Sequence, residues 1–280
     1  MRVWIRTTSL LWGLLLALVV QAQDAGPPVQ EGTRYPGSFY RHLGDAIYFG
    51  KVQDGRRLDA DPATFRVHGE DSFDFQYLTP LGADGDAFFL AWERIAFPGA
   101  HRARVLAPNN NGDCMYLIVS GAKLYRVNKN EKQVEPVAGD ARVKKLEVVA
   151  TGNRRVPPLY FKDDRAVYFY LLDENRLAKL PRADPESFRC ETASYGFELY
   201  LGLDARRVYA GPNPIRGVHR PSFAYVGWVY AKDRRRVYVI SNQEWSVLRG
   251  ADPKTFQVVK GRGIDAVDKN HQYKAGRVVD

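Results

Sequence analysis

The chain has 280 residues, a formal net charge of +9 and 45% hydrophobic residues, of which 16 are tyrosines. Beyond the first 22 residues no apolar run approaches about eighteen residues, so we expect no transmembrane segment in the mature chain. Despite the basic balance, no recognised nucleic-acid-binding signature is present, so we expect no nucleic-acid partner.

Residues 1–22 have the features of an export signal. Arg2 and Arg6 precede an apolar stretch, residues 10–20, that is too short to span a bilayer comfortably. Small residues at the two positions that a signal peptidase reads predict cleavage after Ala22 and a periplasmic or secreted protein. An uncleaved membrane anchor is the alternative. Cleavage would lower Lys and Arg from 41 to 39 against 32 acidic residues, a mature net charge of +7.

The next two regions are less regular. Residues 23–37 contain Gly and Pro clusters that predict a flexible lead-in. Residues 38–153 predict an irregular β region with one degenerate repeat that starts at Asp45. Residues 71–77 alternate aromatic and polar side chains, as a half-buried strand does. Further strands are predicted at residues 87–92, 115–119, 123–127, 134–137 and 146–151.

Metal and cofactor sites have weak support. Asn109, Asn111 and Asp113 place oxygen atoms at alternate positions, as calcium loops do, but the glycine and the bidentate glutamate of such loops are not where they should be. A solvated turn is therefore favoured. The histidines show no metal-type spacing: His42, His68, His101, His219 and His271. We expect no cofactor.

Residues 154–280 form a region of repeats, set off by a predicted linker at residues 154–158. The first repeated motif is Asp-x-x-x-Val-Tyr, which starts at Asp163, Asp204 and Asp233, with a weaker copy at Asp268. It predicts a strand, a tight turn and a second strand, in which the Asp carboxylate accepts a backbone N–H two residues on.

The second repeated motif is Ala-Asp-Pro-x-Thr/Ser-Phe. It occurs at residues 60–65, 183–188 and 251–256, with a damaged copy at residues 221–223. Asp can cap a helix, and proline at the first helical position loses no needed donor. Each copy therefore predicts a single helical turn that anchors its phenylalanine in the core and leads into the next strand.

Together the two motifs resemble the DKNYY family of repeat-containing bacterial proteins. Asp268-Lys269-Asn270 is nearest to the name-giving tripeptide, whereas several other copies carry arginines there. The similarity covers residues 160–273 well and residues 45–89 less well. It implies an exported protein without an assigned activity, and it supplies no catalytic or binding residue.

These patterns predict an all-β fold built from irregular repeats of short antiparallel strands with single helical turns. Two or three strands per unit could stack as an open array or close radially like a propeller. A propeller-like or sandwich-like body is the arrangement that the variable spacing favours.

Catalytic signatures are absent from the sequence. There is no Gly-x-Ser-x-Gly elbow, no phosphate-binding glycine loop and no Ser-x-x-Lys, so we expect no enzyme, with a hydrolase built on a non-local site as an alternative. Cys114 and Cys190 are the only cysteines. An oxidising compartment permits a disulfide between them, and two separated thiols are the alternative.

Two sets of repeated side chains are candidates for binding. The arginines of equivalent turns could line up as one basic stripe, or be ordinary solvated residues: Arg206, Arg207, Arg234, Arg235 and Arg236. Tyr168, Tyr209 and Tyr238 could form a row that stacks sugars or a peptide, or a packing layer. We hypothesise a non-enzymatic module that binds an unknown protein. An immunity-type inhibitor is the more specific form of this hypothesis. A binder of carbohydrate or of an anionic envelope component is the alternative.

Overall fold

The computed structural model describes residues 34–35, 38–50, 55–68, 81–109, 115–128, 130–149, 159–194, 198–241, 244–261 and 263–279. These residues form strands and turns, with three single-turn 3-10 helices: η1 (Ala100–Arg102), η2 (Val143–Lys145) and η3 (Arg220–Ser222). None of the helices in these ranges has the length and apolar character needed to cross a membrane. The all-β class is confirmed, as expected for a chain rich in aromatic and β-branched residues.

The described strands form seven antiparallel sheets in chain order, and each sheet is an up-and-down meander. We call these sheets units 1 to 7. Units 1 and 2 contain β1 (Tyr40–Leu43), β2 (Ala46–Phe49) and β3 (Arg56–Arg57), then β4 (Arg66–His68), β5 (Leu81–Ala83), β6 (Ala87–Leu90) and β7 (Glu93–Ala96). Units 3 and 4 contain β8 (Arg104–Asn109), β9 (Met115–Ser120), β10 (Lys123–Asn128) and β11 (Gln133–Pro136), then β12 (Glu147–Val148), β13 (Tyr160–Lys162), β14 (Val167–Leu171) and β15 (Arg176–Lys179).

Units 5 to 7 each have four strands and carry most of the candidate residues. Unit 5 contains β16 (Arg189–Ser194), β17 (Glu198–Leu203), β18 (Val208–Ala210) and β19 (Asn213–Pro214). Unit 6 contains β20 (Ala224–Gly227), β21 (Tyr230–Lys232), β22 (Val237–Ser241) and β23 (Glu244–Val247). Unit 7 contains β24 (Gln257–Val258), β25 (Ala266–Val267), β26 (Gln272–Lys274) and β27 (Arg277–Val279).

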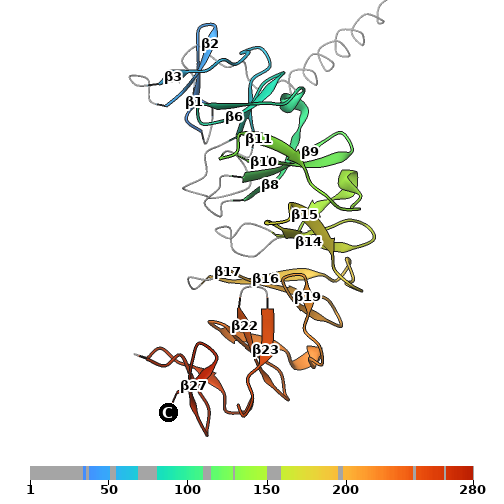
Figure 1. The fold of residues 1–280 in the computed structure, drawn as a ribbon, viewed down its shortest axis with the longest axis vertical. Helices are drawn as coiled ribbons and strands as arrows, with labels where there is room; N and C mark the ends of the chain where they lie inside the picture. Colours follow the sequence, from blue (N-terminus) through green and yellow to red (C-terminus); the bar gives the residue numbers. More distant parts are fainter. Residues whose placement is uncertain are drawn as a thin grey trace, which may run out of the picture.

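The units are stacked in an open, curved row (Figure 1). Unit 1 lies at one end of the row, and unit 7 lies at the other with the C-terminus. Each unit is a meander of the kind that forms a propeller blade. The two ends of the row are far apart, however, so the repeats stack openly and do not close radially.

In three places a tyrosine joins one unit to the next, from the first strand of unit 1 and from the second strand of units 4 and 6. Its ring meets the phenylalanine of the next helical turn edge-on, with ring centroids 5.2–5.3 Å apart: Tyr40 with Phe65, Tyr160 with Phe188, and Tyr230 with Phe256. Its hydroxyl donates to the next unit, to Phe89 O, Gly211 O and Asp265 Oδ1, at 2.6, 2.8 and 2.7 Å. The units are therefore held together by aromatic packing and buried hydrogen bonds.

The predicted helical turns are present. The N–H groups of Phe65 and Phe256 each donate to the carbonyl of the Asp four residues before, at 3.0 Å. The damaged copy also forms a turn, η3, and its Phe223 is buried. All four phenylalanines of this motif are at most 8% exposed, which confirms their role as core anchors.

Several predicted boundaries differ from the structure. The apolar run at residues 87–92 is shorter as a strand, because Ala91 adopts a φ of 59° and turns the chain, leaving Trp92 exposed. The predicted boundary at residue 153 falls inside unit 4, since β12 pairs with β13 across it. Asp45 lies in a two-residue hairpin turn, and the copy equivalent to the later repeats starts at Asp84.

Some predictions lie outside the described residues and stay predictions. They are the export signal, all of the lead-in except residues 34 and 35, the strand at residues 71–77, the linker at residues 154–158, and Asn111, Asp113 and Cys114.

Candidate functional site

The turn between the second and third strands of unit 6 is organised by one carboxylate. Asp233 Oδ1 accepts the backbone N–H groups of Arg235 and Arg236, at 2.7 and 2.8 Å. Its Oδ2 accepts the backbone N–H of His219, at 2.7 Å, and the hydroxyl of Tyr238, at 2.8 Å. We call this arrangement the Asp box. It extends the predicted Asx turn by a second link to the helical turn that opens the unit.

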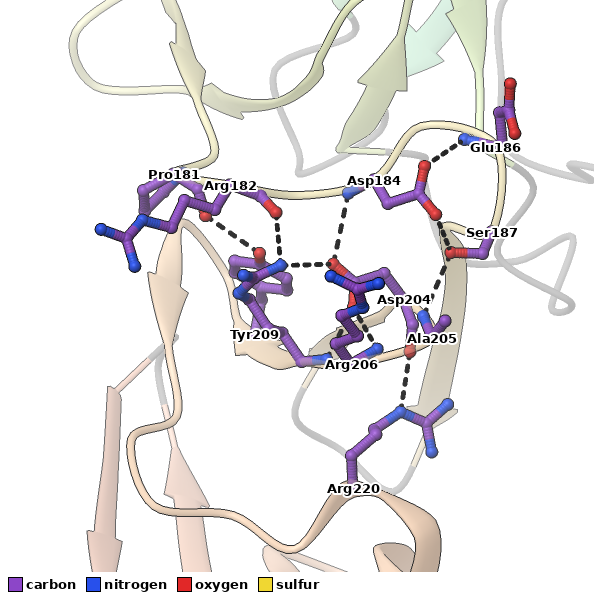
Figure 2. A network of polar contacts seen from close by, with 11 residues as sticks. Pro181, Arg182, Asp184, Glu186, Ser187, Asp204, Ala205, Arg206, Tyr209 and Arg220 are labelled. Carbon is purple, nitrogen blue, oxygen red and sulfur yellow. Dashed lines mark hydrogen bonds and ion pairs between the residues drawn. The ribbon is translucent and has the colours of Figure 1, made fainter.

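Five described units contain an Asp box. The central residues are Asp84, Asp163, Asp204, Asp233 and Asp268, and each accepts two N–H groups of its own turn and one from the preceding helical turn. Tyr168 and Tyr273 supply the hydroxyl contact in units 4 and 7, at 2.9 and 2.8 Å. In unit 5 the Tyr209 hydroxyl instead donates to Pro181 O at 3.0 Å, as Figure 2 shows.

In three of the boxes these hydrogen bonds lower the pKa of the central carboxylate. Burial alone would raise the pKa of Asp233, but the donors from His219, Arg235, Tyr238 and Arg236 outweigh burial and hold the pKa below its usual value. The same balance lowers the pKa of Asp163 and Asp268. The carboxylates of Asp163, Asp233 and Asp268 are therefore ionised at neutral pH, and their oxygen atoms are occupied by protein donors. Their role is structural.

A serine or threonine hydroxyl forms a further link between the helical turn and the box turn. In unit 5, Ser187 Oγ donates to Asp184 Oδ2 at 2.5 Å and accepts the N–H of Ala205 at 3.1 Å (Figure 2). Thr64 and Thr255 do the same in units 2 and 7. This is why the sequence motif requires Ser or Thr before the phenylalanine.

Unit 6 contains a serine–histidine contact at this position. His219 replaces the capping aspartate, and its Nδ1 lies 2.8 Å from Ser222 Oγ. A hydrolase could use such a pair. Here, however, Ser222 Oγ also accepts the N–H of Arg234 at 3.0 Å, and Asp233 receives the backbone N–H of His219, not its imidazole. The contact is a variant of the structural link.

The Asp boxes and helical turns of successive units follow one another along one edge of the row. Lys162 Nζ of unit 4 donates to Pro185 O in the turn of unit 5, at 3.2 Å. Arg220 Nε of unit 6 donates to Asp204 O of unit 5, at 2.8 Å (Figure 2). Lys232 Nζ of unit 6 donates to Phe256 O of unit 7, at 2.9 Å. We call this series of turns in units 4–7 the box edge.

All five predicted arginines lie on the box edge. Arg206, Arg234, Arg235 and Arg236 are exposed, and within the described residues no carboxylate forms an ion pair with them at 4.0 Å or less. Arg207 is partly buried, because its Nη1 donates to Arg182 O at 2.6 Å and lies 3.7 Å from Asp204 Oδ2. With Arg182, Asp184 and Asp204, the Arg206–Arg207 pair lines a recess of about 530 Å³.

Positive charge is concentrated in the C-terminal part of the chain, a feature that the sequence prediction missed. Residues 201–280 contain 15 Lys and Arg but only 7 Asp and Glu, a net charge of +8, whereas residues 23–200 have 24 against 25. Five of the seven acidic side chains accept hydrogen bonds within the protein: Asp204, Asp233, Asp252, Asp265 and Asp268. A charge count by region, in place of the total, would have found this signal.

The tyrosine row is not a ligand surface. Tyr168 is 3% exposed, and Tyr209 and Tyr238 are fully buried. Tyr209 and Tyr238 pack at ring-centroid distances of 5.9 and 6.1 Å against the anchors Phe188 and Phe223. The proposed stacking of sugars on these rings is therefore wrong, because their faces are covered by the core.

Cysteine and metal chemistry find little support in the described residues. Cys190 is a buried thiol whose pKa is raised by burial, so it stays protonated and is a poor nucleophile. Its proposed disulfide partner, Cys114, lies outside the described residues, and the bond stays a prediction. No group of three or more His, Cys, Asp and Glu side chains in the described ranges is arranged to hold a metal ion.

The comparisons with known proteins assign no family. No family model matches the chain, and no curated protein matches it. The resemblance to the DKNYY family therefore stays a prediction that rests on the two repeated motifs.

Proposed function

We propose that the protein is an exported, non-catalytic binding module that holds an acidic macromolecule along its box edge. The observation that carries this proposal is the charge of units 5–7. A net charge of +8 over residues 201–280 coincides with an edge on which four arginines form no ion pair at 4.0 Å or less with a described carboxylate. Clustered charges of one sign focus the potential and raise the local concentration of an oppositely charged partner.

The box makes this edge rigid. The backbone N–H groups of Arg206, Arg207, Arg235 and Arg236 are all bound to box carboxylates, at 2.6–2.8 Å. Each arginine is therefore presented from a fixed turn. Pre-ordering of a binding surface favours affinity, because less conformational entropy is lost on association.

The first partner that we propose is an acidic protein. With such a partner, the module could act as an immunity-type inhibitor. An anionic envelope polymer is the second candidate, because the exposed arginines recur on successive turns along an open row. The burial of the tyrosines removes the argument for recognition of sugar rings by stacking. A hydrolase has less support, since the serine–histidine contact is part of a turn.

The test is affinity capture from envelope extract with three forms of the mature protein. The edge variant carries Arg206→Glu, Arg234→Glu and Arg235→Glu. The control carries Arg56→Glu, Arg57→Glu and Arg66→Glu, three exposed arginines of units 1 and 2, and has the same net charge. We expect the parent and the control to retain the partner at low salt and the edge variant to lose it. Retention should weaken as salt rises, because screening shortens the range of the interaction. Equal recovery by the edge variant and the parent would refute the proposal.

A further inference from the structure

A second recess lies between units 6 and 7, at the ends of the strands opposite the box edge. The box turns join β21 to β22 and β25 to β26, whereas this recess is lined by the links from β20 to β21 and from β26 to β27. Residues 259–261 and 263–265, between β24 and β25, complete it. Its volume of about 560 Å³ is in the range of small-molecule sites.

The walls of the recess are apolar. Val229, Val259 and Ile264 line it together with Trp228, which is 41% exposed although it is a large hydrophobic residue. A tryptophan left open beside other apolar side chains is typical of a surface that binds an apolar group.

The backbone is distorted where it presents this tryptophan. The register of β20 shifts between Tyr225 and Gly227, as in a β-bulge, and Trp228 adopts a φ of 52°. Positive φ is unfavourable for a bulky residue, and such strain is often found at binding sites. The Tyr225 hydroxyl holds the turn by donating to Trp228 O at 2.7 Å. Bulges commonly re-aim a side chain, and here the tryptophan lines the recess.

The polar groups of the recess are mainly cationic. Lys260 and Lys274 are exposed lining residues. Asp265 also lines it, but its Oδ1 accepts the Tyr230 hydroxyl at 2.7 Å and its Oδ2 accepts the N–H of Ala275 at 2.6 Å. Two lysines therefore line a recess with apolar walls. A neutral sugar would need several hydrogen-bonding side chains, which the described lining does not supply.

We propose that this recess binds an amphiphilic anion, a hydrocarbon chain that ends in a carboxylate or a phosphate. The chain lies against Trp228, Val259 and Ile264, and the anionic head lies between Lys260 and Lys274. A free fatty acid and an anionic lipid share this chemistry. The proposal does not depend on the box edge, because the two surfaces lie at opposite ends of the strands.

Calorimetric titration with decanoate and with decanol, both below the concentrations at which they aggregate, tests the proposal. Decanoate should bind the mature protein at least tenfold more tightly than decanol. The double variant Lys260→Met and Lys274→Met should lose at least tenfold in decanoate affinity and keep its decanol affinity. The box-edge variant should bind decanoate like the parent, which separates a failure here from a failure of the proposed function.

Trp228→Gly separates binding from folding. Glycine adopts a φ of 52° without strain, so this variant should keep the thermal midpoint of the parent while decanoate affinity falls. Sedimentation with phosphatidylglycerol vesicles then distinguishes a membrane lipid from a free fatty acid as the ligand. Vesicle binding that requires Lys260 and Lys274 indicates a lipid. Binding of monomeric decanoate without vesicle binding indicates a free amphiphile. Equal affinities for decanoate and decanol, or unchanged decanoate affinity in the lysine or the glycine variant, would overturn the proposal.

Discussion

The Tyr238 hydroxyl donates a hydrogen bond of 2.8 Å to Oδ2 of Asp233, five residues earlier in the chain. The ring of the same tyrosine is buried against Phe223, at a centroid distance of 6.1 Å. One side chain thus fills the core and satisfies a buried carboxylate. This double role accounts for the fixed separation of aspartate and tyrosine in units 4, 6 and 7, whereas the Tyr209 hydroxyl of unit 5 donates to Pro181 O.

Removal of a box carboxylate should destabilise the protein strongly. Asp233→Ala leaves three backbone N–H groups and a buried hydroxyl without their acceptor, and we expect a loss of about 3 kcal/mol in the free energy of unfolding. Asp164→Ala is the matched control, because Asp164 is exposed and forms surface ion pairs with Arg142 and Lys145, and it should cost less than about 1 kcal/mol. Urea denaturation measures both. Similar losses in the two variants would contradict the structural role of the box.

Acid should destabilise the protein through the same groups. Hydrogen bonds lower the folded-state pKa of Asp163, Asp233 and Asp268 below the unfolded value of about 3.9. Their stabilising contribution is therefore fully present above about pH 4 and is lost as the pH falls through the lower, folded-state values. We expect the thermal midpoint to fall steeply below about pH 4, and to fall less steeply in Asp233→Asn. A midpoint equal at pH 3 and pH 6 would be inconsistent with this account.

Gly202 should not tolerate a side chain. A Cβ atom there would lie 3.0 Å from Tyr160 Cζ and closer still to Phe188 Cζ, between two units. Gly202→Ala should therefore cost about 1–3 kcal/mol through overpacking. Gly85→Ala is the control, because its Cβ would lie 3.6 Å from Thr64 Oγ1 and unit 5 already has Ala205 at this position. Differential scanning calorimetry should show a lowered midpoint for the first variant only, and a destabilised control would argue against the packing explanation.

Export should remove residues 1–22. Mass spectrometry of protein recovered from the envelope should then show a chain that begins at Gln23, since small residues precede the predicted cleavage position. Replacement of Ala22 by Tyr should block processing and leave a longer chain. Recovery of an unmodified parent that begins at Met1 would instead favour the membrane-anchor alternative.

The turns of this fold could be predicted from the sequence, because their hydrogen bonds join residues that are two to five positions apart. The turn at Asp233 and the helical turn at Asp252 are of this kind. The link from Asp233 to His219 joins residues 14 apart, and no local pattern indicates it. The repeat at Asp84 was missed because Phe88 and Phe89 replace Val and Tyr while keeping the core packing.

The candidate surfaces were predictable only in part. The exposure of Arg206 and Arg234 follows from their position in turns. The burial of Tyr209 does not follow, because a residue on a strand can face either a neighbouring unit or solvent. The recess beside Trp228 depends on a bulge and a positive φ, which no residue pattern of the chain signals.

The open row also affects how the protein can change in length. Each box closes within its own unit, and the tyrosine link reaches only from one unit to the next, as from Tyr160 to Gly211. In such architectures stability is close to a sum of unit and neighbour contributions. Duplication or deletion of a whole unit would therefore lengthen or shorten the row by one step and leave distant units intact. Related chains could therefore fit partners of different size by gaining or losing whole units, while the core of each remaining unit stays unchanged.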